Sequence, residues 1–570
     1  MANQKYVRWL KHFFYIDRTK EQKRFSLSPQ RPPYHPPVTL RRSYITKGTK
    51  KRPLPAAHAD VQRAFEERFT AHCNPDFVFR TFNLPWGTVA LSFYKSLVDA
   101  LLIQEFIVGP LSQFMPPTGG LPPDQLRDQL TFCHVVSTVS TLEEAATAVG
   151  KGNVFLHVDG ADWGLVISVR NQAGRGVDTP QMEVSLQGPF DAYVEDVETN
   201  LFLVRSRIST PDLVAEPFPA GRRARGPIYL LHIRGLTNPK LVREMRRRIK
   251  SIDVDMIHGI GQLEQYVQDN PSSLFSQALV TERPDRTVAL LLEGSVAVLM
   301  DGSPQALIAP ITFWSLLHSP EDMYFRWPIG TFGRVLRLVS LLITIFLPGF
   351  YVALSNFHLE MLPTEFMLSL AGAREQVPFP AVVTIIFLEL GFELIRESAL
   401  RVPKTIGPTI GIVGAIIIGQ AVVEANVVSP VMIIVMAITV LAGFSVPLYS
   451  LFYSVRIIRL LVLVVSSVFG FYGVVLGVLF LQSHLIRLTS LGAPYVAPVS
   501  PARWSEQDVI RRLPPFYLER RTTIARPIDH RRQAPVSRPW WPHVPLELRY
   551  LQRRYESKEQ KGAVERQAET

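Results

Sequence analysis

The sequence contains only two cysteines, Cys73 and Cys133, among its 570 residues. Two cysteines cannot build a disulfide framework, and the chain has no CxxC pair or Cys/His cluster that would hold zinc. A GxGxxG or Walker-type loop is missing too, so no motif supports nucleotide binding. Asp212, Glu293 and Asp301 could form a carboxylate pair, although nothing in their spacing demands one. Because no nucleophile–base or metal constellation stands out, we expect neither an enzyme nor a cofactor.

The N-terminus lacks the uninterrupted apolar core of a secretory signal, because Arg and Lys side chains break up its apolar run. Residues 26–55 are rich in proline and arginine, which is typical of an extended linker. We therefore predict a basic, Pro-rich extension over residues 1–57 that stays in the cytoplasm.

Positive charge is scarce outside the two ends of the chain. The net charge is +12, yet residues 1–55 alone carry +12 and residues 483–570 carry +7, so the body between them is slightly acidic. Basic ends are typical of proteins that bind nucleic acid or an anionic membrane face. Since the chain also contains apolar stretches of membrane-spanning length, we favour anionic lipids as the partner over nucleic acid. Residues 486–570 are predicted to form a basic C-terminal tail.

Long charge-poor stretches occur only between residues 338 and 482. Four of them are long enough to cross a bilayer, which excludes a wholly soluble protein. Small residues at close-packing spacing favour tightly packed helices over isolated anchors. We expect a polytopic helical membrane domain over residues 331–485, with spans at 338–357, 405–423, 427–446 and 460–482.

The number of spans stays open between four and six, since the positive-inside rule gives conflicting answers for the internal basic loops. A break of the last span at residues 470–473 would reconcile the basic loops with basic ends on one side. We favour both termini, and with them the N-terminal domain, on the cytoplasmic side.

Residues 58–330 alternate instead between strand and helix patterns. The first half predicts a helix at 59–69, a strand at 88–94, a helix at 97–111, a helix capped by Thr141 and Glu144, and a hairpin of 154–158 with 165–169. The second half repeats this order, with a strand at 228–233, helices at 239–252 and 261–268, and a hairpin of 288–292 with 296–300. We therefore predict a soluble α/β domain of two similar lobes, followed by the membrane domain.

A charged loop precedes the last hairpin and contains Glu282, Arg283, Asp285 and Arg286 around a proline. One interpretation is a turn held by local ion pairs. The other is a contact point with a neighbouring subunit or with the membrane half.

Three glutamates interrupt the apolar segment at 378–403. Glu389, Glu393 and Glu397 are spaced four residues apart, which places them on one helical face. An acidic residue at the centre of a membrane helix costs about 2.5–3.5 kcal/mol, so this face is expected to contact protein or water.

Two interpretations of the acidic face remain. In one, Arg396 and Arg401 pair with Glu393 and Glu397, and the helix is held by ion pairs. In the other, the face is part of a cation path. Should the first hold, other polar positions would be candidates for the path: Glu360, Glu365, Gln420 and Glu424.

Several long stretches of the chain resemble one known family. They include TERPDR at 281–286, EGSVAVLMDGSP at 293–304, SPEDMY at 319–324, LPGFYVALSNFHLEMLPTE at 347–365, AGAREQVPFP at 371–380 and FELIRESALRVPKTIGPTIGIVGAIIIGQAVVEANVVSP at 392–430. The resemblance is to the A subunit of bacterial spore nutrient-germinant receptors, the GerA family, over roughly residues 72–500. The Pro/Arg-rich start and the basic tail are less typical of that family.

The resemblance implies a receptor subunit in the inner membrane of dormant spores. In that family it works with a permease-like B subunit and a lipoprotein C subunit, and it is thought to oligomerise into a nutrient-gated ion conduit. Two hypotheses follow for this chain. It is a gated cation-channel subunit, or it is a non-conducting scaffold that assembles the other subunits.

Overall fold

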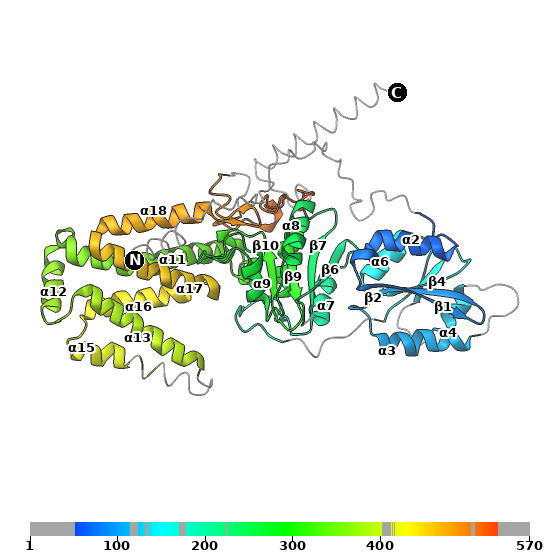
Figure 1. Cartoon of the computed structure of the whole chain (residues 1–570), viewed down its shortest axis with the longest axis horizontal. Coiled ribbons are helices and arrows are strands. Elements are labelled where there is room, and N and C mark those ends of the chain that lie inside the picture. The colour runs from blue at the N-terminus through cyan, green and yellow to red at the C-terminus, as the bar shows by residue number, and fades with distance from the viewer. Residues whose placement is uncertain are drawn as a thin grey trace, which may run out of the picture.

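The computed structural model describes residues 52–533, except 115–122, 131–135, 170–177, 224–225, 402–411, 413, 415 and 503–507. Figure 1 shows three bodies in a row along the long axis of the molecule. We call them lobe 1 (α2 to β5), lobe 2 (α7 to β10) and the membrane domain (α11 to α18). All but the last few residues of the predicted N-terminal extension lie outside the described residues.

Lobe 1 is built on an antiparallel sheet with the strand order β1-β2-β4-β5-β3. Its strands are β1 (Phe77–Leu84), β2 (Gly87–Tyr94), β3 (Val136–Val139), β4 (Val154–Val158) and β5 (Gly164–Ile167). Its helices are α2 (His58–Phe69), α3 (Ala100–Ile103), α4 (Gly109–Gln113), α5 (Pro123–Gln129) and α6 (Leu142–Gly150). A core under α2 and α6 covers one face of the sheet, and a core under α3 to α5 covers the other.

Lobe 2 has a sheet of the same topology, with the order β6-β7-β9-β10-β8. Its strands are β6 (Leu213–Pro219), β7 (Pro227–Ile233), β8 (Leu279–Thr281), β9 (Val296–Met300) and β10 (Ala306–Ala309). Its helices are α7 (Val197–Arg207), α8 (Pro239–Lys250), α9 (Ile260–Val267) and α10 (Pro284–Leu292). Because each strand of lobe 1 has its counterpart at the same place in lobe 2, the prediction of two similar α/β lobes is confirmed.

One predicted hairpin is wrong. Residues 288–292 belong to helix α10, and the partner of β9 is β10. Pro284 stands in the first turn of α10, where its missing N–H costs nothing, and Thr287 and Leu291 are buried four residues apart. A short apolar run fits a buried helix face as well as a strand, so its period alone could not decide.

A buried arginine joins the two lobes. Arg205 of α7 has only 2% of its side chain exposed and pairs through Nε with the Asp76 carboxylate at 2.6 Å. Its Nη2 donates to Asn74 Oδ1 at 3.0 Å, and its guanidinium lies 4.0 Å from the centroid of the Tyr94 ring. Burial is the main cause that raises the pKa of Tyr94. Its Nη1 donates to the carbonyl oxygen of Leu213 in lobe 2 at 3.1 Å, so this arginine binds groups of both lobes and fixes them against each other.

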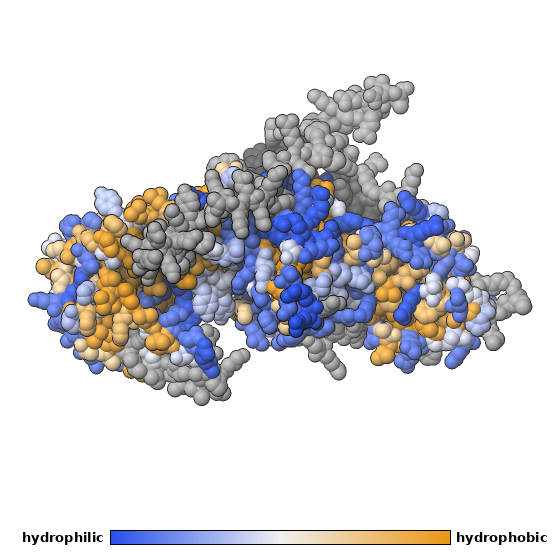
Figure 2. Space-filling model, in the orientation of Figure 1, coloured by the Kyte–Doolittle hydropathy of each residue, from blue (hydrophilic) through white to orange (hydrophobic). Residues whose placement is uncertain are grey.

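The membrane domain begins with α11 (Trp327–Phe357) and continues with α12 (Thr364–Glu375), α13 (Ala381–Arg401), α15 (Val422–Glu424), α16 (Pro430–Phe444), α17 (Tyr449–Phe469) and α18 (Phe471–Arg487). Among the described residues, α11 and α17 are long and apolar enough to cross a membrane, while α16 and α18 are shorter apolar helices. Figure 2 shows hydrophobic surface gathered over this end of the molecule, whereas lobe 2 is mostly hydrophilic.

The predicted single span at 460–482 is wrong, because the helix breaks at Gly470. Gly470 has a φ of 57°, a backbone conformation that glycine adopts without strain. At Gly473 an added Cβ would lie 2.4 Å from the carbonyl oxygen of Val465, so only glycine allows α18 to fold back on α17. About half of the predicted span at 405–423 lies outside the described residues.

Both ends of the membrane domain meet lobe 2. The α11 helix starts there, and at the end of α18 His484 Nε2 lies 3.1 Å from Ser273 Oγ. Beyond α18, Leu491, Ala493 and Tyr495 enter the cores of lobe 2. The chain therefore leaves lobe 2 at the start of α11 and returns to it after α18.

An ionic junction ties α11 to the segment that leads into it and to the segment that follows the membrane domain. The buried Asp322 carboxylate pairs with Arg337 at 2.5 Å and with Arg334 at 3.3 Å, and Arg334 also pairs with Asp508 at 2.9 Å. Burial by itself would raise the pKa of Asp322, but the two arginines of α11 outweigh it and hold this pKa below its ordinary value of 3.8.

Replacing Arg205 with Met should lower the free energy of unfolding by about 3–5 kcal/mol, because Asp76 is left buried without its partner. Thermal or urea unfolding of the purified chain measures this. Lys95→Met is the matched control, since Lys95 and Glu198 also pair across the lobes but are more than half exposed, a setting in which ion pairs contribute about 0–1 kcal/mol. Equal effects of the two substitutions would contradict the role of Arg205.

Asp322→Asn should lower the thermal midpoint of the detergent-solubilised chain by an amount that stays constant above about pH 4. The sign follows from the lowered pKa: the stabilisation is present above the unfolded value and is lost as the pH falls through the folded one. The difference from the unmodified chain should therefore shrink in more acidic buffer. The exposed Asp60, which lies 3.9 Å from Arg63, provides the control Asp60→Asn.

Candidate functional site

The predicted acidic face of α13 meets two arginines of α17. The Glu389 carboxylate forms an ion pair with Arg459, and both side chains are almost completely buried, at 7% and 6% exposed. One turn further along α13, Glu393 forms an ion pair with Arg456. We call these two pairs the ion-pair ladder.

The ladder follows from helix geometry. Glu389 and Glu393 lie one turn apart on α13, and Arg456 and Arg459 lie one turn apart on α17. The later glutamate meets the earlier arginine, which is the register of two antiparallel helices. In the sequence, Arg456 and Arg459 entered only the count of basic residues that the positive-inside rule uses to orient membrane spans. The one-turn spacing that the two arginines share with the two glutamates is the signal that could have paired them.

The predicted partners of the glutamates are thereby partly corrected. Glu397 pairs with Arg401 at 2.7 Å as expected for residues four apart, and both side chains are more than half exposed. Arg396, however, does not pair with Glu393, whose partner is Arg456. Its guanidinium lies 4.3 Å from the ring centroid of Phe452 and 4.8 Å from that of Tyr453. Aromatic rings of α17 therefore hold the cation that sequence spacing assigned to a carboxylate.

The surroundings of the ladder differ on its two sides. The α17 helix packs closely against α11, with Val455 and Val462 buried in the same core as Leu341 and Ile345. The α13 helix contributes Ile385 and Leu388 to a smaller core, but its outer face is largely exposed at Val383, Phe387, Leu390 and Leu394. The arginines thus belong to the packed interior, whereas the glutamates are on a helix at its edge.

This arrangement can do two things chemically. Closed, it neutralises two carboxylates that would each be costly in an apolar setting. Opened by a movement of α13, it would present two carboxylates one turn apart, an arrangement that attracts cations.

The alternative polar positions lie on other elements and are all exposed. Glu360 is in the short helix η5 (Leu359–Met361), 3.7 Å from His358, and Glu365 is in the first turn of α12. Gln420 is in the π-helical turn η6 (Ile417–Ala421), and Glu424 is in α15.

The charged loop predicted at 281–286 is the junction of two elements, running from the last residue of β8 into the first turn of α10. Arg283 is fully buried, pairs with Asp285 at 2.9 Å and donates to Ser185 Oγ at 2.5 Å. Glu282 accepts hydrogen bonds from the backbone N–H groups of Met182 and Glu183, at 2.5 and 2.7 Å. The Arg283–Asp285 pair is a local ion pair of the kind that the first interpretation expected. The loop also holds the segment that connects the two lobes, through Glu282 and Arg283.

The same loop reaches the segment that leads into α11. Arg286 pairs with Glu183 at 2.5 Å and donates to the carbonyl oxygens of Ser315 and His318. Tyr324 donates its hydroxyl to Asp285 at 2.6 Å. Burial alone would raise the pKa of Asp285, yet the bonds from Arg283 and Tyr324 hold it below its ordinary value. The loop therefore bridges the inter-lobe segment and the approach to the membrane domain.

Asp212, Glu293 and Asp301, which were candidates for a carboxylate pair, each have a different partner. Asp212 pairs with Arg68 of lobe 1 at 2.7 Å, across the lobe interface, and with Arg234 within lobe 2 at 3.2 Å. Glu293 pairs with Arg532 at 2.9 Å, and Asp301 lies 3.5 Å from the backbone N–H of Val197. Within the described ranges, no group of three or more His, Cys, Asp or Glu side chains could hold a metal ion.

Comparisons with known proteins agree over most of the chain. Residues 63–524 match the family described as Bacillus/Clostridium GerA spore germination protein. The chain is 38% identical over 463 residues to spore germination protein B1 of Bacillus subtilis strain 168, covering 81% of this chain and 96% of that protein. It is 36% identical over 452 residues to spore germination protein GerLA of Bacillus cereus, covering 78% and 92%.

A solved structure is also similar. The crystal structure of the N-terminal domain of the A subunit of the Bacillus megaterium spore germinant receptor GerK3 is 27% identical, covers 46% of this chain and 97% of its own, and has a TM-score of 0.36. On the family match and on the identity to its relatives over nearly their whole length, this chain belongs to the GerA family of spore germination proteins.

Proposed function

We propose that this chain is the membrane subunit of a nutrient-germinant receptor and that it forms a gated cation path as a homo-oligomer. The observation that carries the proposal is the ion-pair ladder: two carboxylates on an exposed-edge helix, each held by an arginine of the packed interior. Ionisable groups inside a membrane segment are costly, so function is the first explanation to consider for them.

In this proposal the ladder is the closed state. Nutrient binding to the receptor moves α13 away from α17, and Glu389 and Glu393 then face an aqueous path. A ring of copies would multiply their attraction for cations, since closed symmetric assemblies repeat each residue around one axis. The arginines stay in the interior because α17 remains packed on α11.

The proposed setting is the spore inner membrane, with the two lobes on the cytoplasmic side. On the family resemblance, we propose that the receptor also contains a permease-like B subunit and a lipoprotein C subunit. The basic ends of the chain would be attracted to anionic lipids at about 1 kcal/mol for each Lys or Arg near the surface.

A second candidate is a non-conducting scaffold that assembles the other subunits. It is favoured by the complete pairing of the two glutamates, since a brace between helices needs no more than the closed ladder. Both candidates predict that a single substitution at the ladder harms assembly, so a sharper experiment is needed to separate them.

A charge swap separates the two functions. Glu389→Gln alone leaves Arg459 buried and unpaired, which should cost about 3–5 kcal/mol and lower the amount of assembled receptor. Glu389→Arg combined with Arg459→Glu restores a pair and should restore assembly. A conducting ladder should then still release cations at least about tenfold more slowly, because α13 presents an arginine beside Glu393 in place of the second carboxylate.

Receptor levels in spore membranes and nutrient-triggered cation release are the two readouts. Glu397→Gln is the control, because its exposed pair with Arg401 contributes only about 0.3–0.5 kcal/mol and lies outside the ladder. If the charge swap restores both readouts to normal, the ladder is a brace and the scaffold function stands.

Single cysteines test the orientation of the lobes in a background without Cys73 and Cys133. A cysteine at Asp253, which is 75% exposed in lobe 2, should be protected from an impermeant thiol reagent in intact cells. A cysteine at Glu360, 76% exposed after the far end of α11, should be labelled. The reverse pattern would place the lobes outside.

A further inference from the structure

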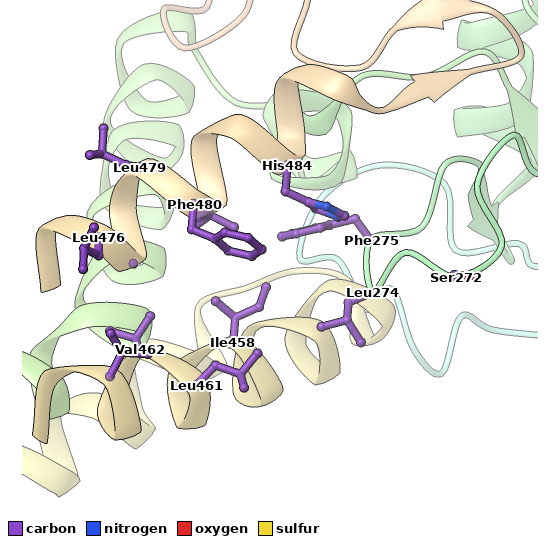
Figure 3. Close-up of a pocket in the computed structure, with 13 residues that line it drawn as sticks. Ser272, Leu274, Phe275, Ile458, Leu461, Val462, Leu476, Leu479, Phe480 and His484 are labelled. Carbon is purple, nitrogen blue, oxygen red and sulfur yellow. The ribbon is translucent and has the colours of Figure 1, made fainter. Parts of the chain in front are cut away.

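An apolar cavity of about 510 Å³ opens where the membrane domain meets lobe 2 (Figure 3). Ile458 and Val462 of α17 line one wall, and Leu476 and Phe480 of α18 line the opposite wall. The loop of lobe 2 that carries Leu274 and Phe275 closes one end. Figure 3 shows the Phe480 ring pointing into the space between the two helices.

The cavity results from the way in which α17 and α18 separate. They are closest at Gly473, and at Gly477 an added Cβ would still lie 3.1 Å from Val462. Further along, His484 turns to lobe 2, where its ring centroid lies 6.0 Å from that of Phe275, with the two rings tilted by 36°. The two helices therefore diverge toward lobe 2 and leave apolar side chains without a partner between them.

The end of the cavity nearest lobe 2 is polar. Ser272 and His484 line it there. Arg487 lies on the same face of α18 as Phe480 and His484, at spacings of seven and three residues, and it is exposed. In the described part of the chain, no carboxylate forms an ion pair with Arg487. An apolar body with a cationic and hydroxyl-bearing end has the chemistry of an amphiphile site.

We propose that the cavity binds one acyl chain of an anionic phospholipid, with its phosphate at Arg487, Ser272 and His484. A space lined by apolar side chains does not hold water, and one that opens between membrane helices is reached directly by the surrounding lipid. A volume of about 510 Å³ falls within the range of small-molecule sites and is only about that of a single turn of a helix 10 Å wide. The helix of a second copy or of another subunit is therefore a poor fit.

The bound chain would connect lobe 2 to the membrane domain. It would touch Leu274, whose carbonyl oxygen accepts a hydrogen bond from Ser454 of α17, and it would touch α18 on its other side. The lipid would thus fill the gap between a loop of the α/β domain and two membrane helices.

Native mass spectrometry of the purified full-length chain in detergent tests this, with dioleoyl phosphatidylglycerol and dioleoyl phosphatidylcholine as probes. We expect one retained phosphatidylglycerol per chain, bound about fivefold more tightly than phosphatidylcholine. Arg487→Gln should remove that preference, while Arg326→Gln, which alters an exposed arginine at the start of α11, should preserve it.

Filling the cavity should abolish retention. Leu461→Trp places a large ring on the α17 wall, and Leu476→Trp does so from α18, so a folding defect in one leaves the other as a test. Val464→Trp is the matched control, since Val464 is on the same helix, is 52% exposed and does not line the cavity. Unchanged retention in folded Leu461→Trp or Leu476→Trp chains would overturn the proposal. Equal binding of the two lipids, or their displacement by glycerol phosphate alone, would overturn it too.

Discussion

A charge inside an apolar helical bundle must be paired, and this constraint determines how the membrane domain is built. Glu389 is buried, so α13 can lie only where a cation meets it, and Arg459 provides that cation. The second pair, between Glu393 and Arg456, fixes the register of the two helices. Replacing such pairs with apolar residues often leaves stability unchanged, so stability alone does not explain them.

The α/β domain is linked to the bundle by a continuous series of ionic contacts. Arg205 joins lobe 1 to lobe 2, the loop at 281–286 holds the segment between them, and Asp322 receives two arginines of α11. Because α11 packs along α17, a rotation of the lobes that moves α11 would also displace the arginines of the ladder. The apolar cavity lies between α17 and α18, beside the stretch of α17 that carries the ladder arginines and next to lobe 2, where a bound lipid would add a further link.

The sequence predicted much of this architecture, and its errors have physical causes. Period-two and capping signals located β2, the β4–β5 hairpin and α6, but the apolar run at 288–292 has no decisive period and was assigned to a strand. The spacing of the glutamates revealed their common face. Their partners were not predicted, since Arg456 and Arg459 lie more than sixty residues away in the chain, and the matching one-turn spacing becomes a pairing only when tertiary packing brings the two helices together. Gly470 was recognisable as a possible break, but the clash that makes Gly473 necessary depends on α17.

In the proposed function, the ladder opens when α13 moves away from α17, whereas a scaffold would keep the two helices joined. Spin labels at Leu390 of α13 and Val464 of α17, both more than half exposed, report the separation of the two helices in the assembled receptor. We predict that this distance increases when nutrient is added and cations are released, and that it increases in the charge-swapped receptor too, although cation release stays slow there. Cation release at an unchanged distance would contradict the claim.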